Sequence, residues 1–120
     1  MADIYTDVGE NLTADYIDGT ASAPANWYGH WGTGAGTAAK GDTTLFTAAS
    51  EARVAAGEAQ PSSNVNRFTY TIVADGTKTI TNTGLFDASS GGNMMLKSDF
   101  TGIPLVLNDS IAFTLDLTHS

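Results

Sequence analysis

Residues 68–76, FTYTIVADG, decide the fold. Aromatic and β-branched residues alternate here with threonines, and this period of two is typical of a strand with one buried face. The Asp75-Gly76 pair that follows favours the positive φ angles of a tight hairpin turn. A second apolar and threonine-rich run covers residues 78–86. The two runs together predict an antiparallel hairpin.

Further strands are predicted on both sides of this hairpin. Residues 111–117, IAFTLDL, alternate apolar with small or polar side chains over their whole length. Residues 94–100 and 103–107 predict two shorter strands, separated by a break at Thr101-Gly102. In the second of these, Ile103, Leu105 and Leu107 share one face, and Pro104 indicates a sheet edge because proline lacks the ladder donor.

The first part of the chain has a different character. Val8, Leu12 and Tyr16 fall at helical spacing, and Gly19 is typical of a helix end. We therefore expect an N-terminal arm or short helix with its linker over residues 1–25. Residues 26–120 should form the β domain.

The overall pattern predicts an all-β protein. About seven or eight short strands, separated by turn residues, are typical of a sandwich or a barrel. We expect a jelly-roll-like antiparallel β-sandwich or barrel that carries the N-terminal arm or short helix. Alternating βα units are not indicated.

The charge balance and the residue types exclude several functions. Thirteen acidic residues against five basic ones give a formal net charge of −8, which disfavours nucleic acid and anionic membranes as partners. The absence of cysteine excludes a disulfide scaffold and thiolate chemistry. The N-terminus lacks the apolar run of a secretory signal, so we expect synthesis in a cytoplasm.

Candidate catalytic and ligand-binding residues do not form a recognisable constellation. The glycine-rich residues 32–41 lack the Gly-Lys-Ser/Thr ending of a phosphate-binding loop. His30 has no nucleophile elbow beside it and is expected on the outer face of a strand. Asp99, Asp109 and Asp116 are generic carboxylates. We predict no enzyme activity, no catalytic or metal-ligating residue and no cofactor.

The aromatic cluster of Trp27, Tyr28 and Trp31 allows two interpretations. It could form a surface platform on which a sugar stacks. The alternation of the strand, however, places both tryptophans on one face, where core packing is the simpler account.

Several short segments, taken in order, resemble a known family. They are residues 31–34 (WGTG), 41–46 (GDTTLF), 79–88 (TITNTGLFDA) and 108–114 (NDSIAFT). Their order and spacing are similar to those of a widespread family of small tailed-bacteriophage virion proteins. Some of its members resemble capsid decoration, or cement, proteins with a jelly-roll fold. The resemblance covers residues 27–117.

This resemblance implies a structural role. The expected protein is a homotrimer on the capsid exterior of the virion, bound to the major capsid protein, where it stabilises the shell against the pressure of packaged DNA. The alternative is a tail, baseplate or fibre component that binds a host surface glycan. Neither function involves nucleic acid or a membrane.

Six apolar residues are expected to contact the shell or a neighbouring subunit. Four lie on the N-terminal segment, which would otherwise leave them uncovered. The other two are adjacent methionines, of which one should point outward from its strand. The six are Ile4, Tyr5, Val8, Leu12, Met94 and Met95.

Overall fold

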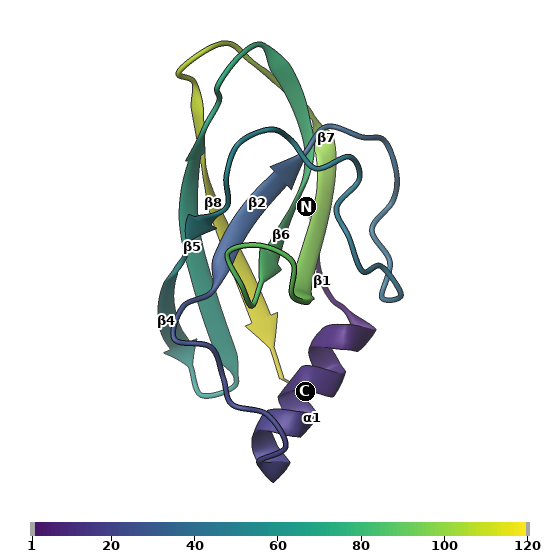
Figure 1. Cartoon of the computed structure of the whole chain (residues 1–120), viewed down its shortest axis with the longest axis vertical. Helices are drawn as coiled ribbons and strands as arrows, with labels where there is room; N and C mark the ends of the chain where they lie inside the picture. Colours follow the sequence, from purple (N-terminus) through teal and green to yellow (C-terminus); the bar gives the residue numbers. More distant parts are fainter. Residues whose placement is uncertain (1, 120) are drawn as a thin grey trace.

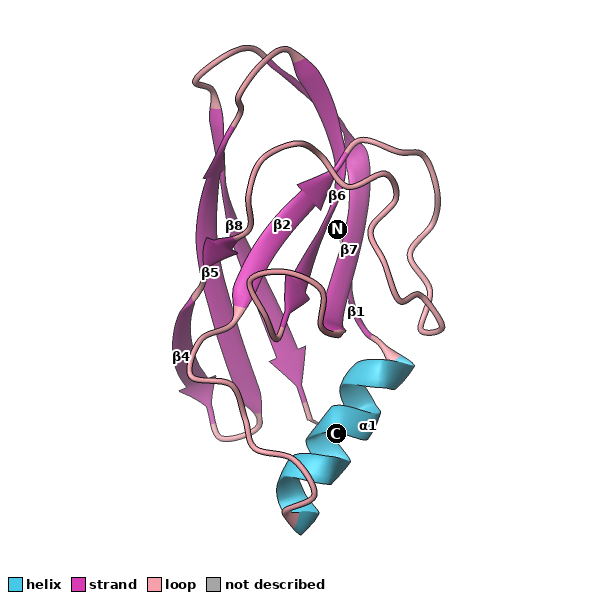
Figure 2. Ribbon diagram, in the orientation of Figure 1, coloured by secondary structure: helices cyan, strands magenta, loops and turns pink. Residues whose placement is uncertain are grey.

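The computed structural model describes residues 2–119, and in this range it has eight strands and one helix (Figures 1 and 2). In chain order the elements are β1 (Ala2–Tyr5), α1 (Asp7–Asp18), β2 (Tyr28–Gly32), β3 (Val54–Ala55), β4 (Gly57–Ser62), β5 (Val65–Val73), β6 (Lys78–Phe86), β7 (Met94–Leu105) and β8 (Ser110–Thr118).

The strands form two antiparallel sheets. One sheet has the order β1-β7-β6-β2-β3 and the other has the order β4-β5-β8. The large apolar side chains of both sheets meet between them in one core cluster. The predicted all-β sandwich is confirmed. In Figure 1 the helix lies at one end of the long axis, and the β5–β6 and β7–β8 connections lie at the other end.

The predicted hairpin of residues 68–86 is wrong. Both strands exist, but β5 pairs with β4 and β8, whereas β6 pairs with β2 and β7. The Asp75-Gly76 segment therefore carries the chain from one sheet to the other. Gly76 is not among the residues with positive φ, so the turn chemistry that the sequence suggested is not used.

Strand β7 also differs from its prediction. It runs without a break through Thr101-Gly102, where its register against β6 shifts. Strand β1 covers β7 only as far as Asp99, so Pro104 lies on the part of β7 that has β6 alone as a neighbour. The edge position predicted from Pro104 is confirmed.

The tryptophans belong to the core. Trp31 is 0% exposed and Trp27 is 7% exposed, and Trp31 packs edge-on against Phe113 at 6.3 Å between ring centroids. A Cβ atom at Gly29 would lie 2.2 Å from the Tyr70 ring, so only glycine lets the two sheets approach at this point. The core interpretation is confirmed, and a surface platform built on both tryptophans is excluded.

The N-terminal segment is docked on the sandwich. The Thr6 hydroxyl accepts a hydrogen bond from the Gly9 N–H at 2.9 Å and caps α1, and Gly19 ends the helix with φ 82°. The helix prediction is confirmed. On the strand before it, the Asp3 carboxylate accepts a hydrogen bond from the Asp116 N–H of β8 at 2.9 Å.

The connection between β2 and β3, residues 33–53, begins with the glycine-rich segment and folds back on the five-stranded sheet; it is called the glycine-rich loop below. The N–H groups of Thr33 and Gly34 donate to the carbonyls of Thr47 and Phe46, both at 2.9 Å. Leu45 of the returning loop packs on Met94 and Phe86 in a second core cluster. The loop is therefore a structural cover for the outer face of this sheet.

Candidate functional site

A buried lysine anchors this loop. Lys97 of β7 is 0% exposed, and its amine donates to the Asp42 carboxylate at 3.0 Å and to the Thr44 carbonyl at 2.8 Å. The same amine lies 3.3 Å from the centroid of the Phe46 ring. Each of these partners comes from the loop. Lys97 thus holds the loop on the sheet, and its charge is neutralised within the fold.

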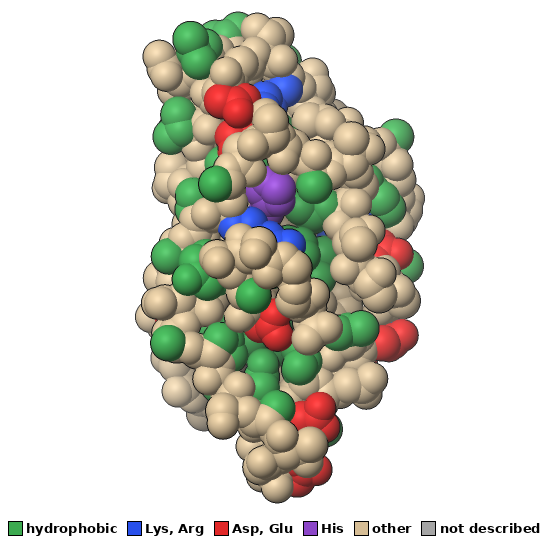
Figure 3. Space-filling model, viewed as in Figure 1, with side chains coloured by type: hydrophobic (Ala, Val, Ile, Leu, Met, Phe, Trp, Pro, Cys, Tyr) green, Lys and Arg blue, Asp and Glu red, His purple; other side chains and the backbone are tan. Residues whose placement is uncertain are grey.

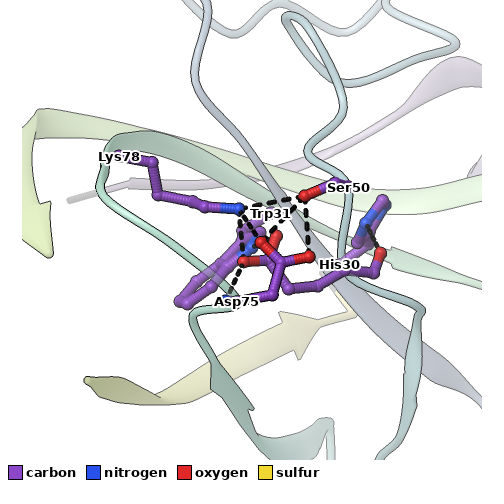
Figure 4. Close-up of polar contacts among 6 residues, drawn as sticks. His30, Trp31, Ser50, Asp75 and Lys78 are labelled. Atoms are coloured by element: carbon purple, nitrogen blue, oxygen red, sulfur yellow. Dashed lines mark hydrogen bonds and ion pairs between the residues drawn. The ribbon is translucent and has the colours of Figure 1, made fainter. Parts of the chain in front are cut away.

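A second polar cluster joins the five-stranded sheet to the segment before β3 and to the β5–β6 connection (Figure 4). The Glu51 carboxylate accepts hydrogen bonds from the Trp31 indole N–H at 2.8 Å and from the Asp75 backbone N–H at 2.9 Å. Lys78 lies 2.5 Å from the same carboxylate and 2.7 Å from the Asp75 carboxylate. Ser50 donates to Asp75 and accepts from Lys78 at 3.1 Å.

The charges of this cluster suit a structural role. A serine–lysine pair works as a nucleophile and base only when the lysine is neutral. Burial would lower the Lys78 pKa, but the bonds to Asp75 and Glu51 outweigh burial and raise it. Burial would likewise raise the pKa of Glu51, whereas the hydrogen bonds from Lys78, Trp31 and the Asp75 N–H lower it to about 2. Both groups therefore stay charged and paired at neutral pH.

The other candidate catalytic residues do not come together in a common site. His30 lies on the outer face of the five-stranded sheet, as predicted, but the loop buries it there beside Leu45 and Phe86. Its Nε2 forms a 2.7 Å hydrogen bond with the Glu51 carbonyl, and burial lowers its pKa. Asp109 accepts from the Val106 N–H at 2.9 Å within a turn. Asp116 pairs with Arg67 at 2.8 Å. Within residues 2–119, no three histidine, aspartate or glutamate side chains are placed to hold a metal ion.

One side of the sandwich is open between β7 and β8. A groove of about 540 Å³ lies there. Among the described residues, β8 pairs only with β5, and β7 beyond Asp99 pairs only with β6. Both strands therefore present a free backbone edge beside the groove. The groove is lined by Phe100, Thr101, Ile103, Ile111, Ala112, Phe113 and Thr114.

Exposed apolar side chains gather at the end of the molecule that carries the β5–β6 and β7–β8 connections. We call Val73, Ile103, Val106 and Leu107 the apolar tip; their exposed fractions are 52%, 38%, 57% and 61%. Hydrophobic side chains reach the surface at the end opposite α1 in Figure 3. The sequence pattern placed Ile103, Leu105 and Leu107 on one face, but only Leu105 is buried. Ile103 pairs with Ile80 of β6 and lines the open groove, whereas Leu107 lies beyond the end of β7.

The opposite end of the sandwich holds a smaller pocket. Helix α1 lies over this end (Figure 2), and a pocket of about 260 Å³ remains between the helix and the strands. Trp27 forms part of its wall. The polar side chains around it come from distant parts of the sequence, so no local motif indicated the pocket.

The six predicted contact residues have different surroundings. Tyr5 and Leu12 pack against the core, and Ile4 and Val8 are half-buried. Met95 lies in the main core, and Met94 faces outward from the sheet, as the strand alternation predicted, but Leu45 of the loop covers Met94, so both are buried. Contact of these residues with another chain stays a prediction.

The chain is thus a small β-sandwich with an open side and exposed apolar side chains at one end. Residues 5–115 match a family model described as podophage GP4 fiber I protein gp80. The chain belongs to this family and is a phage virion structural protein of the fibre type. The predicted tailed-phage virion class is confirmed. No significant match was found among curated proteins or solved structures. No helix in residues 2–119 has the length and apolar character needed to span a membrane.

Proposed function

We propose that the protein is a non-enzymatic structural subunit of a podophage fibre and that it assembles with copies of itself through the open side of its sandwich. The family match over residues 5–115 carries the fibre assignment. The apolar tip, the groove of about 540 Å³ and the two free strand edges support the assembly surface.

Charge favours another copy of the chain at this surface. Two copies with a formal charge of −8 repel each other wherever their carboxylates face. Residues 100–115 contain one charged residue, Asp109, whose carboxylate is already bonded to the Val106 N–H. Contact at this end therefore buries apolar area without bringing carboxylates together. The free edge of β8 can also pair with a strand of the neighbour. The expected assembly is a homotrimer.

Replacing Leu107 by aspartate should weaken this association. Leu107 is 61% exposed in the single chain, so Leu107→Asp adds a charge to the interface without disturbing the fold. Burying one leucine contributes roughly 1.5–3 kcal/mol, so we expect the association constant to fall about tenfold or more. Sedimentation velocity over a concentration series measures this.

The matched control is Ile17→Asp. Ile17 is 83% exposed on α1, at the other end of the molecule, and its replacement should leave association unchanged. A wild-type chain that stays monomeric at high concentration would contradict the proposed assembly. Equal association of the two variants would contradict the choice of surface.

The number of copies per virion tests whether the protein belongs to a fibre or to the capsid. Quantitative mass spectrometry of purified virions should give a few copies per particle if the chain belongs to a fibre. Copy numbers comparable with the major capsid protein would instead support the alternative, a decoration protein on the capsid exterior. Immunogold labelling of intact virions provides an independent location.

A further inference from the structure

The pocket beneath α1 combines an apolar floor with a polar rim. Its volume of about 260 Å³ lies below the roughly 300–1,000 Å³ of pockets that enclose drug-sized ligands, so it suits one small ring. The floor consists of Trp27, Phe68, Met95 and Leu117. The rim is formed by Thr13, Tyr16, Glu58, Asn66 and His119.

Trp27 supplies an unused hydrogen-bond donor. The Trp31 indole N–H donates to Glu51 at 2.8 Å, but the Trp27 indole N–H has no partner within residues 2–119. The Trp27 side chain is only 7% exposed, yet the described residues contain no fully buried polar side-chain atom that lacks a partner. The Trp27 N–H is therefore not fully buried, and the pocket is a surface hollow that the Trp27 side chain lines.

The rim carries further free polar groups. The Glu58 carboxylate is exposed and has no hydrogen-bond partner among the described side chains. Asn66 accepts a 2.8 Å hydrogen bond from His119 Nε2 through its Oδ1, which leaves the amide N–H groups as donors. Tyr16 lies edge-on to Trp27 at 6.4 Å between ring centroids, so two aromatic rings border the pocket.

We propose that this pocket binds a single neutral sugar ring, a hexose or an N-acetylhexosamine, at the exposed end of a host surface glycan. A sugar has apolar C–H faces that pack on aromatic rings, and hydroxyls that bond to carboxylate and amide groups. The inference deepens the proposed function, because a fibre is a virion part that can meet the host surface.

The charges select against acidic sugars. Glu58 stands at the rim of a chain whose formal charge is −8, so a uronic or sialic acid would be repelled. A neutral ring avoids this repulsion and can use the carboxylate as an acceptor for its hydroxyls. The pocket should therefore discriminate by charge among sugars of similar shape.

The test is a titration of the ¹⁵N-labelled protein followed by NMR. The chain has two tryptophans and so two indole N–H signals. Methyl glycosides of glucose, galactose, mannose and N-acetylglucosamine are the probes, with methyl galacturonic acid as the acidic control. We expect at least one neutral sugar to shift the Trp27 signal saturably, with a dissociation constant of roughly millimolar order. The Trp31 signal should stay in place.

Two variants test whether the Glu58 carboxylate takes part in binding. Glu58→Gln removes the charged acceptor and should weaken binding about tenfold. Glu10→Gln is the matched control, because Glu10 lies on α1 but pairs with the exposed Lys40 and does not line the pocket. Failure of all four neutral sugars to shift the Trp27 signal would overturn the proposal, as would equal weakening by both variants.

A purified host polysaccharide that ends in the bound sugar should displace the methyl glycoside from the pocket. Failure to compete would overturn the glycan part of the proposal. The titration uses the isolated chain, so its outcome does not depend on where the protein sits in the virion. A capsid-like copy number with an intact Trp27 titration would remove the fibre assignment and leave the sugar pocket standing.

Discussion

Replacing Lys97 by alanine is expected to lower the free energy of unfolding by about 3 kcal/mol, as measured by urea denaturation. Lys97 is fully buried and is bonded to Asp42 and to the Thr44 carbonyl. Removing one partner of a buried ion pair typically costs 3–5 kcal/mol, and the effect should lie near the lower end because Asp42 retains 24% of its exposure. The glycine-rich loop should detach from the sheet.

The control for this prediction is Lys40→Ala. Lys40 pairs with Glu10 on the surface, where both side chains are about half exposed and solvent screens the pair, so its loss should lower the free energy of unfolding far less than the loss of Lys97. If the two alanine variants unfold at the same urea concentration, the loop does not depend on the buried amine.

The second large effect is a loss of stability in acid that depends on Glu51. Its pKa falls from 4.5 to about 2 in the folded chain because Lys78, Trp31 and the Asp75 N–H stabilise the carboxylate against the opposing effect of burial. The unfolded state binds the proton first, so this contribution is complete above pH 4.5 and is lost as the pH falls through about 2. The difference in pKa corresponds to about 3 kcal/mol as an upper value.

The measurement compares wild type with Glu51→Gln in urea at several pH values. The difference in unfolding free energy should be largest near pH 6 and should shrink steadily toward pH 2. Glu58→Gln, an exposed change of the same type, serves as the control and should show no such trend. A difference that stays constant from pH 6 to pH 2 would mean that Glu51 does not titrate with folding.

The sequence predicted the strands better than their pairing. Residues 68–73 and 111–117 alternate because one face of each strand is buried. The buried face does not depend on which strand is the neighbour, so the alternation predicts a strand but not its partner. Pairing depends on distant contacts. Asp75-Gly76 suits a connection within one sheet or between two. The pairing observed places β5 and β2 in opposite sheets, where Tyr70 packs against Gly29 across the core.

The surfaces were harder to predict for a related reason. Met94 is covered by Leu45, which is far away in the sequence, so strand periodicity indicated exposure where the loop provides burial. Ile103 and Leu107 follow an apolar pattern, but Ile103 borders the open groove and Leu107 lies after the end of β7, so neither is buried. The pocket beneath α1 needed Trp27 and Glu58, which are distant in the sequence, to be brought together. In contrast, Pro104 predicted the sheet edge correctly, because proline has no N–H to donate to a neighbouring strand wherever it lies in the fold.

The pairing of β1 with β7 has a consequence for how the chain folds as it is made. Residues near the start of the chain, Ala2–Tyr5, pair with Leu96–Asp99. A ribosome adding 5–20 residues per second needs roughly 5–20 s to make the intervening segment. During this interval the nascent β1 segment has no strand to pair with. The five-stranded sheet can therefore close only after residues 96–99 have been made and have left the ribosome.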